Sequence, residues 1–319
     1  MHYGSFAHRE DLAARMKLEY EGKDLTIALP SGKSIEEPTL RLLDNAHIEV
    51  DRIHSRACSA SISGFPQITR AVFLKPSMIG MQVAYGAIPI GITGSDIVGE
   101  DDCEHVQICA ELPYNRATFG TKMRVVIFTR NENDVRSVRD INPRAKFISE
   151  YPRLTRIFFE ENGIKGAYVP ECPGSAEALV VIGKYDYGVA ITETGVSLQV
   201  NGLKEIATIL ESTTVLIANT GFLKIPGMRE LVDHLGKTLQ GPLTARGKVY
   251  LVMNASAASV ADICRGLPSL KEPTVQLLHD PAFCSIAAVV PAIEVNALKM
   301  KLAALGASGF VELDPVSIA

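Results

Sequence analysis

The chain has 319 residues and a mass of 34.5 kDa, which favours two or three domains over one. Hydrophobic residues make up 47% of it and charged residues 21%, so the composition is that of a folded globular protein and excludes disorder as the main state. The formal net charge of −4 excludes a dedicated nucleic-acid binder, which would carry a basic excess.

The first third of the chain predicts helices that alternate with strands. Leu12, Met16 and Tyr20 recur at every fourth position, which is typical of an amphipathic helix. Ser34 is a residue type that caps helices, so a helix is expected to begin there. The predicted elements are a helix at 10–20, a strand at 25–29, a helix at 34–45, strands at 48–53 and 70–74, a helix at 78–85 and a strand that ends in 90–94. This alternation predicts a mostly parallel α/β sheet.

The same alternation returns in the middle of the chain. Strands are predicted at 123–129, 146–148, 167–170, 187–192, 206–209 and 214–219, and helices at 152–162, 175–182 and 226–240. Two α/β lobes explain this layout better than one continuous sheet.

The last segment has a different order of elements. It predicts a strand, a helix, two strands, a helix and a strand, at 247–254, 256–266, 274–278, 285–290, 293–305 and 309–313. This is the order of a ferredoxin-like split βαβ module, which is common among small regulatory domains. Gly241 and Pro242 mark the expected boundary before it.

Neither a membrane helix nor a signal peptide is visible in the sequence. No apolar run approaches the roughly 20 residues of a membrane helix, and the N-terminus carries His, Arg, Asp, Glu and Lys where a signal peptide would need an uninterrupted apolar core. We therefore expect a cytoplasmic protein. The six cysteines are scattered without a CxxC pair, so they are expected to be reduced and to form no zinc site.

Two loops that follow strands have residue types suited to anion binding. In Val189–Leu198 (VAITETGVSL), hydroxyl side chains surround Gly195 at a strand end, where backbone N–H groups can cradle an anion. An ordinary turn or helix cap would have the same sequence. Gly91–Asp96 (GITGSD) also follows a strand, and a tight turn capped by Asp96 is its alternative interpretation.

A third loop, Pro30–Ser34 (PSGKS), is similar to part of a Walker A motif. The first glycine of that motif is missing, since Ile27 stands at its position, so a true P-loop is disfavoured. Lys33 remains a candidate cation for a phosphate, with a simply solvated lysine as the alternative.

Several segments in a fixed order resemble one enzyme family. They are LTIALPSGKSIEEP, FLKPSMI, GITGSDIV, SEYPRLTRIFFEENGI, GSAEA and ETGVSLQVNGL, followed by YLVMNASAASVADICRGLPSLKEPTVQLL and KLAALGASGFVELDPVSI. Together they resemble the long form of ATP phosphoribosyltransferase, the first enzyme of histidine biosynthesis, over residues 25–319. Only the N-terminal helix is left without a counterpart.

The resemblance implies a fold and a reaction. The fold is a two-lobed body like a type II periplasmic binding protein, whose chain crosses between the lobes twice, plus a C-terminal ferredoxin-like regulatory domain. The reaction transfers phosphoribose from phosphoribosyl pyrophosphate to N1 of ATP, with inversion and release of pyrophosphate, and Mg²⁺ accompanies the pyrophosphate. Histidine would inhibit through the C-terminal domain, and the protein would form a dimer or hexamer. The implied divisions are 1–23 for the N-terminal helix, 24–118 and 200–245 for lobe I, 119–199 for lobe II and 246–319 for the regulatory domain.

The resemblance also implies site residues. Catalytic roles fall to Lys33, Lys75 and Glu177. The phosphoribosyl donor would be held by Ala190, Glu193, Thr194, Gly195, Val196, Ser197 and Leu198, and ATP by Ser31, Gly32, Gly94, Gly174 and Ser175. Histidine would contact Asn254, Leu270 and Thr274, and no protein ligand for a metal is expected.

Three positions lack an acidic side chain that the family carries. Met78, Pro89 and Ala190 stand where the resemblance leads us to expect carboxylates, and the one at position 190 would contact the ribose hydroxyls. Loss of one such charge-assisted hydrogen bond costs about 1.5–3 kcal/mol. Two alternatives therefore stand beside the family reaction: a divergent relative with another acceptor or donor, and a catalytically silent protein that senses a small molecule.

Overall fold

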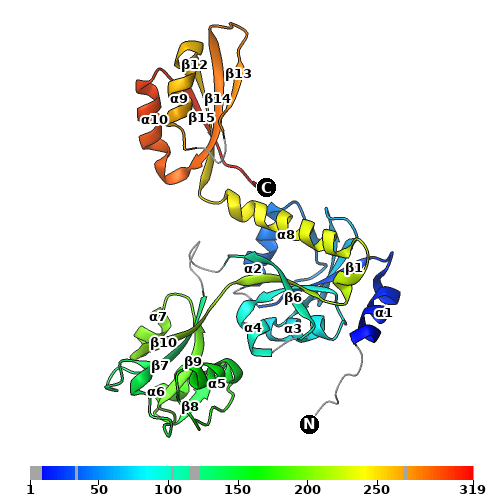
Figure 1. The fold of residues 1–319 in the computed structure, drawn as a ribbon, viewed down its shortest axis with the longest axis vertical. Coiled ribbons are helices and arrows are strands. Elements are labelled where there is room, and N and C mark those ends of the chain that lie inside the picture. The colour runs from blue at the N-terminus through cyan, green and yellow to red at the C-terminus, as the bar shows by residue number, and fades with distance from the viewer. Residues whose placement is uncertain (1–8, 33–34, 102–103, 115–122, 269–271, 319) are drawn as a thin grey trace. The chain divides into compact units, whose positions relative to one another are not determined.

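The computed structural model describes residues 9–32, 35–101, 104–114, 123–268 and 272–318 (Figure 1). The chain divides into two compact units, residues 1–237 and 238–319. The predicted cap at Ser34 lies outside the described residues. None of the helices in the described part of the chain is long and apolar enough to cross a membrane.

The first unit begins with a helix that is fixed to the sheet-forming part of the chain by its last turn. Helix α1 (Arg9–Tyr20) confirms the helix predicted at 10–20. Met16 and Tyr20 are buried, and the Tyr20 hydroxyl donates to the carbonyl oxygen of Gly86 at 3.1 Å. The Tyr20 ring meets the edge of the Phe222 ring at a centroid distance of 5.8 Å. This helix therefore belongs to the packed body.

A seven-stranded sheet forms the first lobe. Its order is β2 (Glu49–Asp51), β3 (Ser59–Ser63), β4 (Ile68–Leu74), β1 (Leu25–Pro30), β5 (Ile90–Gly94), β11 (Thr214–Asn219) and β6 (Val106–Leu112). Only the β4–β1 and β1–β5 pairs are parallel, and the other four are antiparallel. The predicted mostly parallel sheet is therefore wrong. The pairs β2–β3 and β3–β4 are hairpins between strands that follow each other in the chain. Strand β11 returns from the other lobe and runs antiparallel to both of its neighbours. The helices of this lobe are α2 (Glu36–Asn45), α3 (Pro76–Ala84) and α4 (Ser95–Asp101).

The second lobe has a four-stranded sheet in the order β10 (Leu203–Ser212), β7 (Met123–Arg130), β9 (Tyr187–Thr192) and β8 (Phe147–Ser149). Its helices are α5 (Pro152–Glu161), α6 (Ala176–Val181) and α7 (Val196–Val200). β10 pairs with β7 from end to end, so the second crossing lies at Thr213 and not at the expected boundary of 200. The strand expected at 167–170 does not form, and only Glu171 bridges to Ser149. The long helix α8 (Met228–Ala245) follows β11.

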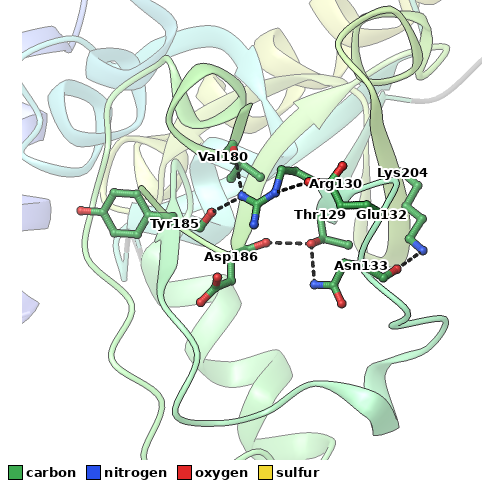
Figure 2. Close-up of polar contacts among 8 residues, drawn as sticks. All are labelled: Thr129, Arg130, Glu132, Asn133, Val180, Tyr185, Asp186 and Lys204. Atoms are coloured by element: carbon green, nitrogen blue, oxygen red, sulfur yellow. Dashed lines mark hydrogen bonds and ion pairs between the residues drawn. The ribbon is translucent and has the colours of Figure 1, made fainter. Parts of the chain in front are cut away.

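An arginine at the end of β7 ties that strand to the helix that carries the candidate residue Glu177. The Arg130 guanidinium donates to the carbonyl oxygen of Val180, in the last turn of α6, at 2.9 Å and to that of Tyr185, just beyond this helix, at 3.2 Å (Figure 2). A cation at the carbonyl end of a helix also interacts favourably with the helix dipole. Beside it, the Thr129 hydroxyl donates to the Asp186 carbonyl oxygen at 2.7 Å.

Arg130→Gln is expected to lower the free energy of unfolding by about 1–3 kcal/mol, because two partly buried carbonyl oxygens lose a charged donor. Chemical denaturation followed by circular dichroism measures the change. Arg139→Gln, at an exposed residue, is the matched control and should stay within about 0.5 kcal/mol of the unsubstituted chain. Equal effects of the two substitutions would contradict this role for Arg130.

The second unit is a four-stranded antiparallel sheet with two helices on one face. In chain order it comprises β12 (Lys248–Ser256), α9 (Val260–Gly266), β13 (Thr274–Leu277), β14 (Phe283–Pro291), α10 (Val295–Ala304) and β15 (Ser308–Leu313). The sheet order is β13-β14-β12-β15, which is that of a ferredoxin-like module. Leu251, Met253, Ile286 and Leu302 lie in its core, on the helix-covered face. The predicted module is therefore confirmed.

Candidate functional site

Two cavities of similar size lie in the first unit and share one wall residue, Ile191. One has a volume of about 390 Å³ and is lined by Glu150, Ser175, Glu177, Ala178, Val181, Ile182, Ala190, Ile191 and Asn201. The other has a volume of about 380 Å³ and its lining includes Pro76, Gly94, Asp96, Tyr151, Glu193 and Ser212. Expected site residues from three separate stretches of sequence therefore line two neighbouring cavities.

The loop at the end of β9 has the backbone shape expected of an anion-binding turn. Gly195 has φ +74°, a conformation that L side chains rarely adopt, and its N–H donates to the Thr192 hydroxyl at 3.1 Å. The Val196 N–H lies 3.5 Å from the Thr194 hydroxyl, and α7 begins at Val196. The loop is thus held by its own hydroxyls, with Thr194 and Ser197 exposed.

One hydrogen bond joins this loop to the segment GSAEA. The Ser197 hydroxyl donates to Glu177 Oε2 at 2.6 Å, although the two residues are 20 positions apart in the chain. Glu177 lies in the first turn of α6, and its side chain also faces the 390 Å³ cavity. The expected donor-binding loop and the expected catalytic carboxylate therefore meet.

The backbone before α6 adopts two consecutive left-handed conformations. Gly174 has φ +85° and Ser175 has φ +74°. The second is uncommon for a residue with a Cβ, and such conformations concentrate at binding sites. This turn places Ser175 on the wall of the cavity beside Glu177.

A half-buried carboxylate that the sequence did not single out lines the same cavity as this turn. Glu150 follows β8 directly and lines the same cavity as Ala190. Burial raises the pKa of Glu150, the Ala176 N–H that donates to it lowers the pKa, and the nearby Glu177 raises it further. The local signal was only its place within the motif SEYP, which carries no chemistry by itself.

The first-lobe residues expected at the site lie at the ends of neighbouring strands. Ser31 and Gly32 follow β1, Lys75 precedes α3 and is exposed, and Gly94 ends β5. The Gly32 N–H already donates to Glu36 Oε2 at 3.0 Å. Lys33 lies outside the described residues.

The departures from the family pattern differ in exposure. Met78 is 42% exposed, whereas Pro89 and Ala190 are buried. Ala190 lines the 390 Å³ cavity, so only this departure changes the chemistry of a cavity wall there.

Asp96 forms a buried hydrogen-bond hub and is not the simple helix cap of the alternative interpretation. It is 4% exposed and accepts the Tyr151 hydroxyl at 2.7 Å and the Ser212 hydroxyl at 2.5 Å. Glu100, on the same helix, accepts the backbone N–H groups of Arg153 at 2.8 Å and Leu154 at 2.9 Å. These bonds link α4 of the first lobe to the start of α5 in the second.

Asp101 ends the same helix with a carboxylate oxygen that is buried without a hydrogen-bond partner among the described residues. Burial, followed by the negative charges of Glu100, Asp96 and Glu171, raises its pKa from 3.8 to about 6. Its folded-state pKa therefore lies above the unfolded value, so its ionisation destabilises the fold as pH rises from about 4 through about 6.

We expect Asp101→Asn to raise the melting temperature above pH 6, because the substitution removes the buried charge, and to have little effect at pH 4, where the acid is mostly protonated in the fold. Melting curves of both proteins between pH 4 and pH 8 test this. A difference that stays constant with pH would contradict the assignment of the titration to Asp101.

The residues expected to contact histidine lie in the second unit. Asn254 and Thr274 are exposed. Asn254 alternates with the core residues Leu251 and Met253 along β12, which places it on the face away from the helices. Thr274 pairs with Ala287, itself paired with Val252, and so shares that face. Leu270 lies outside the described residues.

Comparisons with known proteins agree with this architecture. A family model described as ATP phosphoribosyltransferase matches residues 75–241, and one described as HisG, C-terminal domain, matches residues 245–314. The ATP phosphoribosyltransferase of Pelotomaculum thermopropionicum is 34% identical over 288 residues, covering 90% of this chain and 96% of that protein. ATP phosphoribosyltransferase 1 of Geobacter sulfurreducens is 34% identical over 292 residues, with the same coverage. A solved ATP phosphoribosyl transferase (HisG:HisZ) complex from Thermotoga maritima matches with a TM-score of 0.54 at 22% identity, covering 68% of this chain and 96% of that one, which shows a shared fold.

Proposed function

Since the chain belongs to the ATP phosphoribosyltransferase family in its long form, we propose that it transfers phosphoribose from phosphoribosyl pyrophosphate to N1 of ATP. The bond from the anomeric carbon to pyrophosphate breaks with its electron pair leaving on the pyrophosphate. A bond from N1 to that carbon forms on the opposite face. The protein is then a pentosyltransferase of histidine biosynthesis.

The observation that carries this proposal is the hydrogen bond between Ser197 and Glu177 at the 390 Å³ cavity. It brings the loop Glu193–Leu198, which would hold the 5′-phosphate, next to the carboxylate of the GSAEA turn. A reaction in which charge separates between sugar and pyrophosphate needs positioned substrates and stabilised anions, and no covalent nucleophile. Thr194, Ser197 and backbone N–H groups of the loop would position the donor.

Of the residues expected to hold ATP, Gly94 lines the neighbouring cavity, whereas Ser175 lines the 390 Å³ cavity. Ser31 and Gly32 follow β1 and Lys75 follows β4, and these parallel strands end at the same edge of the sheet. We assign ATP to this side and the cations Lys75 and Lys33 to its phosphates or to pyrophosphate. Mg²⁺ would enter with the pyrophosphate of the substrate, because this ion usually binds phosphates with few protein ligands. The described residues include no cluster of three or more His, Cys, Asp or Glu that would hold a metal.

The C-terminal unit would carry the regulation. We propose that residues 246–319 bind histidine near Asn254 and Thr274 and that the protein is a cytoplasmic homo-oligomer, a dimer or a hexamer. Support comes from the match of residues 245–314 to the C-terminal family domain. Within the first unit, lobe I would comprise residues 24–118 and 213–237, and lobe II the segment between them, a division that the sheet pairing supports.

Incubation of the protein with ATP, phosphoribosyl pyrophosphate and Mg²⁺ tests the proposed reaction. The expected result is the N1-phosphoribosyl adduct, seen as a rise in near-ultraviolet absorbance that disappears when either substrate is omitted and falls when histidine is added. Binding of both substrates without any product would contradict the transfer and favour a sensor. Product formed only with another base would favour a divergent acceptor.

A further inference from the structure

The missing carboxylate at position 190 has a close neighbour that carries one. Ser149 pairs with Val189 in the parallel β8–β9 ladder, and the Glu150 N–H donates to the Val189 carbonyl oxygen at 3.0 Å. Residues 150 and 190 are therefore next to each other across the strand ends. Both line the 390 Å³ cavity.

Glu150 lies at the wall of this cavity. It is half-buried, and Glu177 lines the same cavity. The Glu177 Oε2 already accepts the Ser197 hydroxyl. Ala190 contributes no polar atom to the same wall. Glu150 is therefore a charged group in the cavity wall to which no role has yet been assigned.

We propose that Glu150 contacts the sugar of the phosphoribosyl donor and accepts a hydrogen bond from its vicinal hydroxyls. The inference rests on the proposed function, since it concerns the same donor. The family pattern places a carboxylate on β9, whereas here the carboxylate is that of Glu150, at the end of β8, the strand that pairs with β9. The alanine at position 190 leaves room for the longer glutamate side chain to reach the same part of the cavity.

The chemistry of the sugar favours this role. Vicinal hydroxyls are hydrogen-bond donors, a carboxylate accepts from them, and charge-assisted bonds are about twice as strong as neutral ones. Removal of one such acceptor is expected to weaken donor binding by about 10- to 100-fold. Binding of a ligand without a sugar should change little.

The test is calorimetric titration of the full chain with phosphoribosyl pyrophosphate and, separately, with inorganic pyrophosphate, both with Mg²⁺. Glu150→Ala is expected to weaken the first by about 10- to 100-fold and the second by less than about 3-fold. Glu161→Gln, at an exposed glutamate on α5, is the control and should change neither. The double variant Glu150→Ala with Ala190→Asp should regain most of the donor affinity, because it returns a carboxylate to the same wall.

Three outcomes would overturn the inference. Equal weakening of both ligands by Glu150→Ala would indicate a merely structural role. Unchanged donor affinity in that variant would remove Glu150 from the sugar. Failure of a folded double variant to regain affinity would place the sugar elsewhere in the cavity; if Ala190→Asp prevents folding, the comparison of the two ligands decides alone. Failure of the unsubstituted chain to bind the donor would instead overturn the proposed function, so the two failures are distinguishable.

Discussion

Asp96→Ala should lower the free energy of unfolding by about 2–6 kcal/mol, because each of two buried hydroxyl donors loses its acceptor at a cost of about 1–3 kcal/mol. The donors are Tyr151, which is 6% exposed, and Ser212, which is 2% exposed. The Ser212 hydroxyl also lies 3.2 Å from the Ser95 hydroxyl, so its share of the cost is the smaller one. Most surface substitutions change stability by less than about 0.5 kcal/mol, so this effect is diagnostic.

Chemical denaturation followed by circular dichroism measures the loss, with Asp134→Ala at an exposed aspartate as the control. Tyr151→Phe separates the two bonds. It removes the Tyr151 donor and leaves Asp96 Oδ2 buried without it, so it should cost about 1–3 kcal/mol, less than the loss of both bonds. If Asp96→Ala destabilised no more than Tyr151→Phe, the hub would not support the link between α4 and α5.

Local pattern predicted those elements whose burial is strong and regular. All central residues of β7 and most of β9 are buried, and both strands were predicted. Strand β3 (SASIS) was missed although its residues alternate in burial as in a half-buried strand, because its three serines are also typical of loops. The direction of each strand in the sheet could not be predicted from local sequence patterns either. β5 and β11 pair across more than 100 residues of chain, and nothing in either strand specifies its partner.

Part of the candidate site could likewise be predicted from the sequence, and part of it could not. The loop Glu193–Leu198 and the GSAEA turn were predicted because their residues are contiguous and resemble a family motif. The contacts of Asp96 were not, since Ser212 lies 116 residues away and Tyr151 lies 55 residues away. Glu150 was missed for another reason. Its proposed role depends on the alanine at position 190 in the neighbouring strand. Neither segment of the sequence shows this relation by itself.

Glu177→Ala is expected to lower kcat/KM for the phosphoribosyl donor by about 10- to 100-fold through loss of one charge-assisted hydrogen bond, with more if the carboxylate also contacts substrate. The reason is that Glu177 orients Ser197, and thereby the loop proposed to hold the 5′-phosphate. Ser197→Ala should act in the same direction. Because both variants break one bond, their effects should not add in the double variant.

Steady-state kinetics with varied donor concentration measure this coupling, and thermal melting checks that each variant is folded. Glu160→Gln, at an exposed glutamate on α5, provides the unaffected control. Fully additive losses from Glu177→Ala and Ser197→Ala would mean that the two side chains act independently. Non-additive losses confined to the donor would instead tie the Glu177 carboxylate to the loop, and would explain why a protein that lacks the acid at position 190 keeps the GSAEA turn beside the end of β9.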